Sequence, residues 1–113
     1  SITQTWITQG PGTPLFAPPE QLNNCKELID WRADQFSTGV TLSFCVLGYH
    51  PYSIETDTGF ECVDRVAAWQ QPSSRFIEAI AKLQLSVLSQ MVCAYPVQRV
   101  RTPQKLLTRW LEQ

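Results

Sequence analysis

Charged side chains are scarce in this chain, and their scarcity limits the possible folds more than any other feature of the sequence. Only 17% of the 113 residues are charged, whereas 43% are hydrophobic and four are Trp. A disordered chain has many charges and few aromatic residues, so we expect this chain to fold. Its length matches one ordinary domain, and we therefore expect residues 1–113 to form a single domain.

The cysteines and the absence of long apolar runs predict a cellular location. Cys25, Cys45, Cys62 and Cys93 are far apart in the sequence, and free buried thiols behave as small hydrophobic groups. No stretch reaches the roughly 18 to 20 apolar residues of a membrane span, and the first residues lack the basic-then-apolar pattern of a signal peptide. We expect a cytoplasmic protein with reduced thiols and no membrane contact.

Two segments have the composition of β-strands. Residues 2–8 are rich in β-branched and aromatic types, which predicts a short strand. Residues 39–49 alternate large apolar side chains onto one face, which predicts a second strand. Between them, residues 9–18 are rich in Pro and Gly and are interpreted as an extended connector, so residues 19–113 form the main body.

Apolar residues at helical spacing predict the remaining elements. The expected helices cover residues 19–36, residues 74–94 and a C-terminal segment that begins at the cap Thr102. Their apolar faces are expected to consist of Leu22, Cys25, Leu28, Ile29, Ala33 and Phe36 in the first helix, of Phe76, Ile77, Ile80, Leu83, Val87, Leu88, Met91 and Val92 in the second, and of Leu106, Leu107, Trp110 and Leu111 in the last. We therefore predict an α+β domain in which a small antiparallel sheet packs with three to four helices. A mainly α domain with one β-hairpin is the alternative.

Residues 52–71 are open to two interpretations. Thr58 and Glu61 have the spacing of a capping box, which predicts a helix over residues 59–71. The same stretch also suits a hairpin, with residues 52–56 paired to residues 60–64. We favour the helix.

The residues that carry chemistry are few. His50 is the only histidine, and Cys45 and Cys62 are the cysteines nearest to it. A catalytic Cys–His pair needs the thiolate beside the imidazole, and structural zinc sites favour ligand pairs two to four residues apart. No such ligand pair exists here, so we expect no metal or other cofactor and no enzymatic activity. A Cys/His enzyme is kept as a third hypothesis.

Charge is divided unevenly along the chain. Residues 1–64 hold two cations and eight anions, a net charge of −6, and residues 65–113 hold seven cations and two anions, a net charge of +5. The two halves either fold onto each other or meet partners of opposite charge. Four cations lie close together near the C-terminus and are candidates for contact with nucleic acid or an acidic partner: Arg99, Arg101, Lys105 and Arg109.

Few charges and many tryptophans together predict an interaction surface. A surface with so few charges leaves apolar area exposed, and exposed apolar patches mark binding sites. Trp is enriched at the centres of interfaces, and the candidates here are Trp31, Trp69 and Trp110. We therefore expect a small, non-catalytic interaction or regulatory protein that binds itself or another protein, with a nucleic-acid-binding regulator as the alternative.

Overall fold

The computed structural model describes residues 13–113, and all regular structure in this part of the chain is helical. The predicted α+β class and its antiparallel sheet are therefore wrong for these residues. The strand expected over residues 2–8 lies outside them. The elements, in order, are η1 (Pro14–Phe16), α2 (Pro19–Leu22), η2 (Lys26–Leu28), α3 (Trp31–Leu47), α4 (Glu61–Ala67), α5 (Ser74–Lys82), α6 (Val87–Met91), η3 (Pro96–Gln98) and α7 (Pro103–Glu112).

Helix α3 replaces the strand expected over residues 39–49. Its start is capped by Asp30, whose carboxylate accepts a hydrogen bond from the Arg32 amide at 2.9 Å. Its end is formed by Gly48, which adopts the left-handed conformation at φ 81°. Between these caps, the buried residues recur at helical spacing, and they include Ala33, Phe36, Val40 and Ser43. The apolar residues of this segment thus fit both the alternation of a strand and the spacing of a helix, and the chain adopts the helix.

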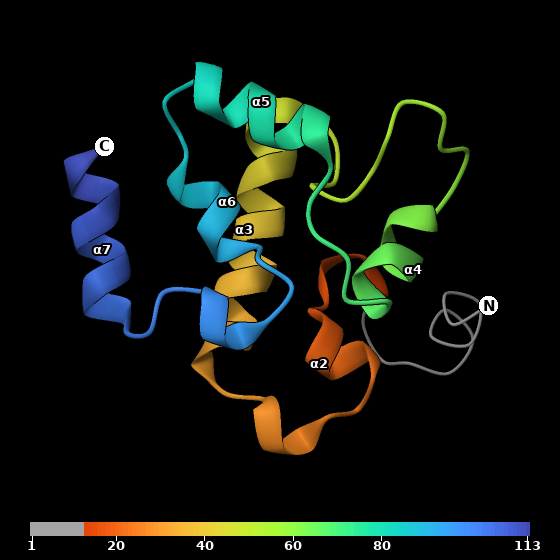
Figure 1. Cartoon of the computed structure of the whole chain (residues 1–113), viewed down its shortest axis with the longest axis horizontal. Coiled ribbons are helices and arrows are strands. Elements are labelled where there is room, and N and C mark those ends of the chain that lie inside the picture. The colour runs from red at the N-terminus through yellow and green to blue at the C-terminus, as the bar shows by residue number, and fades with distance from the viewer. Residues whose placement is uncertain (1–12) are drawn as a thin grey trace.

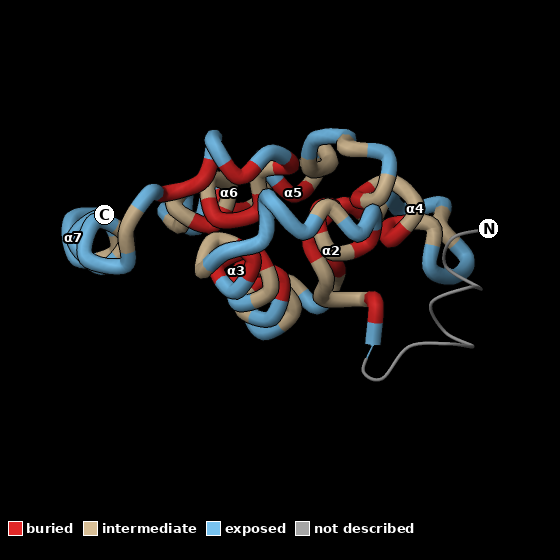
Figure 2. The backbone as a smooth tube through the Cα atoms, turned by 90° about the horizontal axis from the view of Figure 1, so that it is seen from below, coloured by how far each residue is buried: buried red, intermediate tan, exposed pale blue. Residues whose placement is uncertain are grey.

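Gly39 explains how α3 reaches the centre of the molecule. An added Cβ atom at this position would lie 2.7 Å from Val92 Cγ1 and 3.0 Å from Met91 Cβ. The absence of a side chain therefore lets α6 pack directly on α3. The core gathers around this contact (Figure 2) and includes Phe36, Val40, Phe76, Ile80, Leu88, Met91 and Val92.

The helices expected over residues 19–36 and 74–94 are each interrupted. The first is divided into α2, η2 and the beginning of α3, with Asn24 at φ 55°. The second is divided into α5 and α6, with Gln84 at φ 60°. A residue in the left-handed conformation ends an α-helix, so both expectations of a continuous helix are wrong.

The helix expected over residues 59–71 is confirmed, although it is shorter. Helix α4 covers Glu61–Ala67, and the rival hairpin is not formed. The Thr58 amide donates a hydrogen bond to the Glu61 carboxylate at 2.8 Å, as the predicted capping box requires. The helix nevertheless begins at Glu61 after Phe60, so Thr58 is not its N-cap and the Thr58 hydroxyl bond is not formed.

Helices α2 to α6 pack together into the main body of the molecule, and α7 lies at its edge. Helices α3, α5 and α6 occupy the middle, α2 and α4 lie together on one side, and α7 lies at the opposite end (Figure 1). Helix α7 contains no buried residue, whereas all the other α-helices do. Within residues 13–113, no helix is both long and apolar enough to cross a bilayer.

Candidate interaction surface around the C-terminal helix

A buried ion pair fixes the chain just before α7. The Arg99 guanidinium donates to both carboxylate oxygens of Glu20, at 2.6 and 2.9 Å, and neither side chain has any exposed area. Its remaining N–H groups donate to the carbonyl oxygens of Arg32, Cys93 and Ala94 at 2.9 to 3.0 Å. A guanidinium has five donors, and all five are satisfied. Arg99 therefore holds the fold together and is unavailable to an external partner.

Two further residues of α3 hold the next two positions of the chain. The Gln35 side-chain amide donates to the Val100 carbonyl and accepts from the Val100 amide, both at 2.9 Å. The Trp31 indole N–H donates to the Arg101 carbonyl at 2.8 Å. Because residues 99, 100 and 101 are all held in this way, α7 begins from a fixed point on the body.

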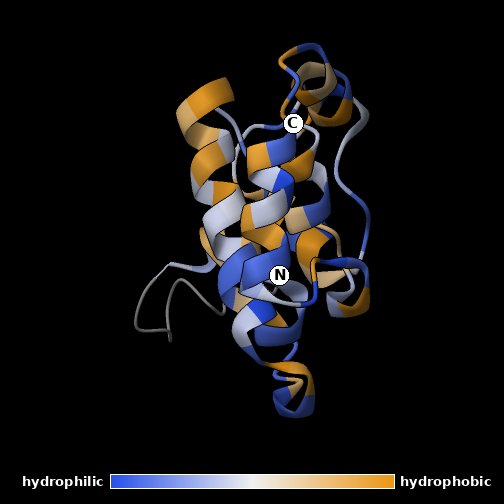
Figure 3. Ribbon diagram, turned by 90° about the vertical axis from the view of Figure 1, so that its left-hand side faces the viewer, coloured by the Kyte–Doolittle hydropathy of each residue, from blue (hydrophilic) through white to orange (hydrophobic). Residues whose placement is uncertain are grey.

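Helix α7 itself touches the body along only part of its surface. Thr102 caps its start as predicted, with the hydroxyl accepting from the Lys105 amide at 3.2 Å. Leu106 and Trp110 pack against the core, whereas Leu107 and Leu111 are 61% and 78% exposed. Figure 3 looks onto this helix and shows hydrophobic and hydrophilic residues alternating along it. About half of its apolar side is therefore uncovered.

Three of the four predicted C-terminal cations lie at the surface. Arg101, Lys105 and Arg109 are exposed, and the Arg109 guanidinium donates a hydrogen bond to the Gln90 side chain. At 100° per residue, Lys105 and Arg109 project from the opposite side of α7 to the one that carries Leu107 and Leu111. The exposed apolar stripe and the cations therefore form separate surfaces.

The uneven charge of the two halves is partly balanced inside the molecule. Three ion pairs each join an acid of residues 1–64 to an arginine of residues 65–113: Glu20 with Arg99 at 2.6 Å, Asp57 with Arg65 at 2.6 Å, and Glu55 with Arg75 at 3.4 Å. These pairs use three of the eight acids of residues 1–64 and three of the seven cations of residues 65–113, so part of the uneven charge is balanced within the molecule.

The other predicted interface residues lie away from α7 or beneath it. Trp31 is partly buried and its N–H group is hydrogen-bonded within the chain. Trp69 is at φ 60°, and its ring stacks on Tyr95 with 5.0 Å between centroids and 22° between planes. Trp110 alone lies beside the exposed stripe of α7. Leu107 and Leu111, the most exposed leucines of the described residues, were expected on the apolar face of the last helix but were not named as interface residues.

Of the two cysteines nearest to His50 in the sequence, Cys45 is exposed on α3, and Cys62 is buried in a protonation state that does not suit a nucleophile. His50 is buried, its Nδ1 accepts from the Tyr52 amide at 3.0 Å, and its Nε2 therefore carries the proton and donates to the Leu15 carbonyl at 3.0 Å. Burial lowers the pKa of His50 to about 4 and raises the pKa of the Cys62 thiol to about 11. A thiolate–imidazolium pair requires the opposite protonation states.

The buried histidine predicts a specific dependence of stability on pH. Unfolded His50 has its ordinary pKa of 6.5 and the folded residue a pKa of about 4, so the unfolded chain binds more protons between these pH values. The free energy of unfolding should therefore fall as the pH is lowered from about 6.5 to about 4, by on the order of 3 kcal/mol in total. Urea denaturation at a series of pH values measures this loss.

The matched variant for this measurement is His50→Gln, which has no titrating ring. Its profile should be flatter than that of the wild type between pH 6.5 and pH 4. Asp57, whose pKa is held at about 2 by the Arg65 guanidinium, contributes only at lower pH and is common to both proteins. Identical slopes for the two proteins in the upper range would contradict the assignment of a neutral, buried His50.

Neither a metal cluster nor a known relative indicates a function. Among residues 13–113, no group of three or more His, Cys, Asp or Glu side chains could hold a metal ion. Comparison of the chain with protein-family models, with curated proteins and with solved structures gives no match. The proposals below therefore depend on the structure and the sequence alone.

Proposed function

We propose that the chain is a small, non-catalytic interaction protein that associates with a second copy of itself through α7. The observation that carries the proposal is the exposed pair Leu107 and Leu111 on a helix that has no buried residue. A helix with an apolar stripe normally covers that stripe, and apolar side chains left exposed together mark contact sites.

The anchoring of α7 supports its role as a contact element. Residues 99–101 are held by Glu20, Gln35 and Trp31, so the helix is presented in a defined direction. A helix presented in this way loses little freedom when it binds, and preorganisation of this kind favours association.

The absence of charge on the stripe favours a second copy as the partner. The side chains that flank Leu107 and Leu111 on α7 are Pro103, Gln104, Thr108 and Trp110, none of which is charged. Two such stripes meet without like-charge repulsion in a two-fold contact, in which Leu107 of one copy lies near Leu111 of the other. Because a ten-residue helix is only about 15 Å long, the contact is smaller than a standard interface, and we expect weak association.

The test is sedimentation across roughly a hundredfold range of concentration, up to about 1 mM. The wild-type weight-average mass should rise with concentration, and added salt should leave this rise unchanged or strengthen it, since the contact is apolar. The double variant Leu107→Glu/Leu111→Glu should be monomeric throughout, because it places buried, unpaired charge in the contact.

The matched control is Lys105→Glu, which changes the charge of the helix by two units, as the double variant does, but on the exposed side of α7 opposite the stripe. It should associate nearly as well as the wild type. A wild-type protein that is monomeric at every concentration would overturn the proposal, as would unchanged association of the double variant.

The structure offers less support for the alternative of a nucleic-acid-binding regulator. With Arg99 buried, the candidate surface retains three exposed cations, Arg101, Lys105 and Arg109. Each phosphate contact contributes about 0.9 to the slope of log affinity against log salt, and strong binding proteins make roughly 6 to 10 such contacts. Three cations support at most weak binding, so we favour protein contact.

The cytoplasmic location stays a prediction.

A further inference from the structure

A pocket of about 370 Å³ lies between the end of α3, the loop that precedes α4 and the η1 segment. Its apolar walls include Leu15, Phe44, Ile54 and Phe60. Ligand pockets in proteins are mostly apolar, with a few well-placed polar groups, and range from roughly 300 to 1,000 Å³. This pocket falls at the small end of that range, so it would suit a small ligand.

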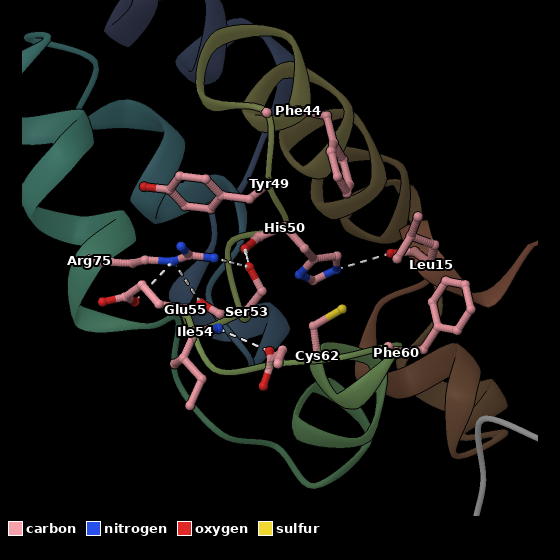
Figure 4. Close-up of a pocket in the computed structure, with 13 residues that line it drawn as sticks. Leu15, Phe44, Tyr49, His50, Ser53, Ile54, Glu55, Phe60, Cys62 and Arg75 are labelled. Carbon is pink, nitrogen blue, oxygen red and sulfur yellow. Dashed lines mark hydrogen bonds and ion pairs between the residues drawn. The ribbon is translucent and has the colours of Figure 1, made fainter.

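Arg75 is held in a fixed position at one side of the pocket. Its guanidinium lies 3.9 Å from the centre of the Tyr49 ring. It also donates from Nε to the Ser53 carbonyl at 3.2 Å and from Nη2 to the Ser53 hydroxyl at 2.8 Å. Figure 4 shows the guanidinium lying along the Tyr49 ring. In this view His50 and Cys62 lie between Arg75 on the left and Phe60 on the right. A charge held in this way is preorganised for a ligand.

The acid that Arg75 contacts is loosely held. Glu55 approaches the Arg75 Nε at 3.4 Å, and its side chain is 74% exposed. Exposed pairs of this kind are weak, so a carboxylate from a ligand can take the place of Glu55. The other acid of the pocket, Asp57, is held by both Nη atoms of Arg65 at 2.6 and 2.7 Å, and its charge is therefore already balanced.

The floor of the pocket is uncharged. His50 and Cys62 both line it and are buried. The ring nitrogens of His50 are both hydrogen-bonded to the backbone. Arg75 is therefore the one cation among the lining residues, and the one lining acid that is not held by another arginine is the exposed Glu55. A single fixed guanidinium beside apolar walls matches a ligand with one negative charge and an apolar body.

We propose that this pocket binds a small amphipathic carboxylate, with the carboxylate on Arg75 in place of Glu55 and the apolar body against Phe44 and Phe60. A guanidinium pairs well with a carboxylate because its N–H groups match the two oxygens. Binding at this site is independent of α7 and of the proposed self-association.

The test is to titrate the full chain with phenylacetate and, separately, with hexanoate. Binding is monitored by NMR through the amide chemical shifts of residues 48–62. Both acids should cause saturable shifts with a Kd on the order of 1 mM or tighter. Phenethyl alcohol has a similar apolar body without the charge and should bind at least about tenfold more weakly, since a hydrogen bond to a charged group is lost.

Two variants of the pocket have opposite expected effects. Arg75→Gln should weaken binding of both acids by about tenfold or more, and Glu55→Gln should tighten it by about two- to fivefold, because the competing carboxylate is removed. Arg75→Lys keeps the charge and should fall between the wild type and Arg75→Gln. Amide spectra of each unliganded variant verify that it is folded.

Three results would overturn the proposal. One is the absence of saturable shifts with either acid in the wild type up to tens of millimolar. The second is equal binding of phenethyl alcohol and phenylacetate. The third is a folded Arg75→Gln variant that binds the acids as well as the wild type does.

Discussion

Replacing Arg99 with methionine should lower the free energy of unfolding by about 3 to 5 kcal/mol, the cost of breaking a buried ion pair. The substitution leaves the Glu20 carboxylate without its partner in a position with no exposed area. It also removes the donors to the carbonyl oxygens of Arg32, Cys93 and Ala94, and buried acceptors without partners are costly. Chemical denaturation followed by tryptophan fluorescence measures the loss.

The matched control is Arg32→Met, which breaks the ion pair with Asp30. That pair joins side chains that are 25% and 47% exposed, so its loss should cost less than about 1 kcal/mol. The double variant Glu20→Leu/Arg99→Met should be more stable than Arg99→Met alone, because no unpaired charge stays buried. If Arg99→Met costs no more than Arg32→Met, the central role of the Glu20–Arg99 pair is refuted.

The sequence predicts many core positions because apolar spacing is a local property. Leu22, Phe36, Phe76, Ile80 and Leu88 were all expected on helical core faces, and all five are buried. The start signal of α7 is equally local, because the Thr102 cap forms with an amide three residues later. These features depend only on residues close together in the chain, so they can be predicted from a single sequence.

The expected core residues that are exposed lie close to the helix breaks. Leu28, Ile29 and Leu83 are 38 to 50% exposed, although each fits the apolar spacing of its expected helix. Once the chain turns at Asn24 or Gln84, the residues near and beyond the turn no longer share a face with those before it. When a helix break is missed, residues after the break are therefore predicted to be buried although they are exposed.

The breaks were missed because the residues that form them are unusual. Two residues after the last residue of α2, α4 and α5, the chain adopts φ values of 55 to 60° at Asn24, Trp69 and Gln84. In each case the next amide bonds the carbonyl five residues earlier: Cys25 to Glu20, Gln70 to Arg65 and Leu85 to Ile80, at 2.8 to 3.2 Å. Glycine normally occupies this position, so a search for glycine finds none of the three.

The burial of the predicted contact residues could be read from the sequence only in part. Arg101, Lys105 and Arg109 are exposed, and Trp110 is half-buried against the core; their role as contact residues stays a prediction. Arg99 could not be assigned to the core, because its partner Glu20 lies 79 residues away in the sequence. Nothing local in the sequence distinguishes a buried arginine from an exposed one when the pairing acid is so distant.

Gly39→Val should lower the free energy of unfolding by about 2 to 3 kcal/mol, toward the upper end of the cost of overpacking a core. The new Cβ atom would lie 2.7 Å from Val92 Cγ1, and Val92 is fully buried and β-branched, so it has little freedom to move. The gain in helix propensity from replacing glycine is at most about 1 kcal/mol. The clash therefore outweighs the propensity, and α3 must separate from α6.

The matched control places the same side chain one residue earlier. Thr38 is exposed on the outer side of α3, and Thr38→Val should change the free energy of unfolding by no more than about 0.5 kcal/mol. If residues 39–49 were a strand instead, position 39 would lie at its end, and a β-branched residue there would be tolerated or favourable. Equal stability of the two valine variants would thus contradict both the contact between α3 and α6 and the helical assignment of this segment.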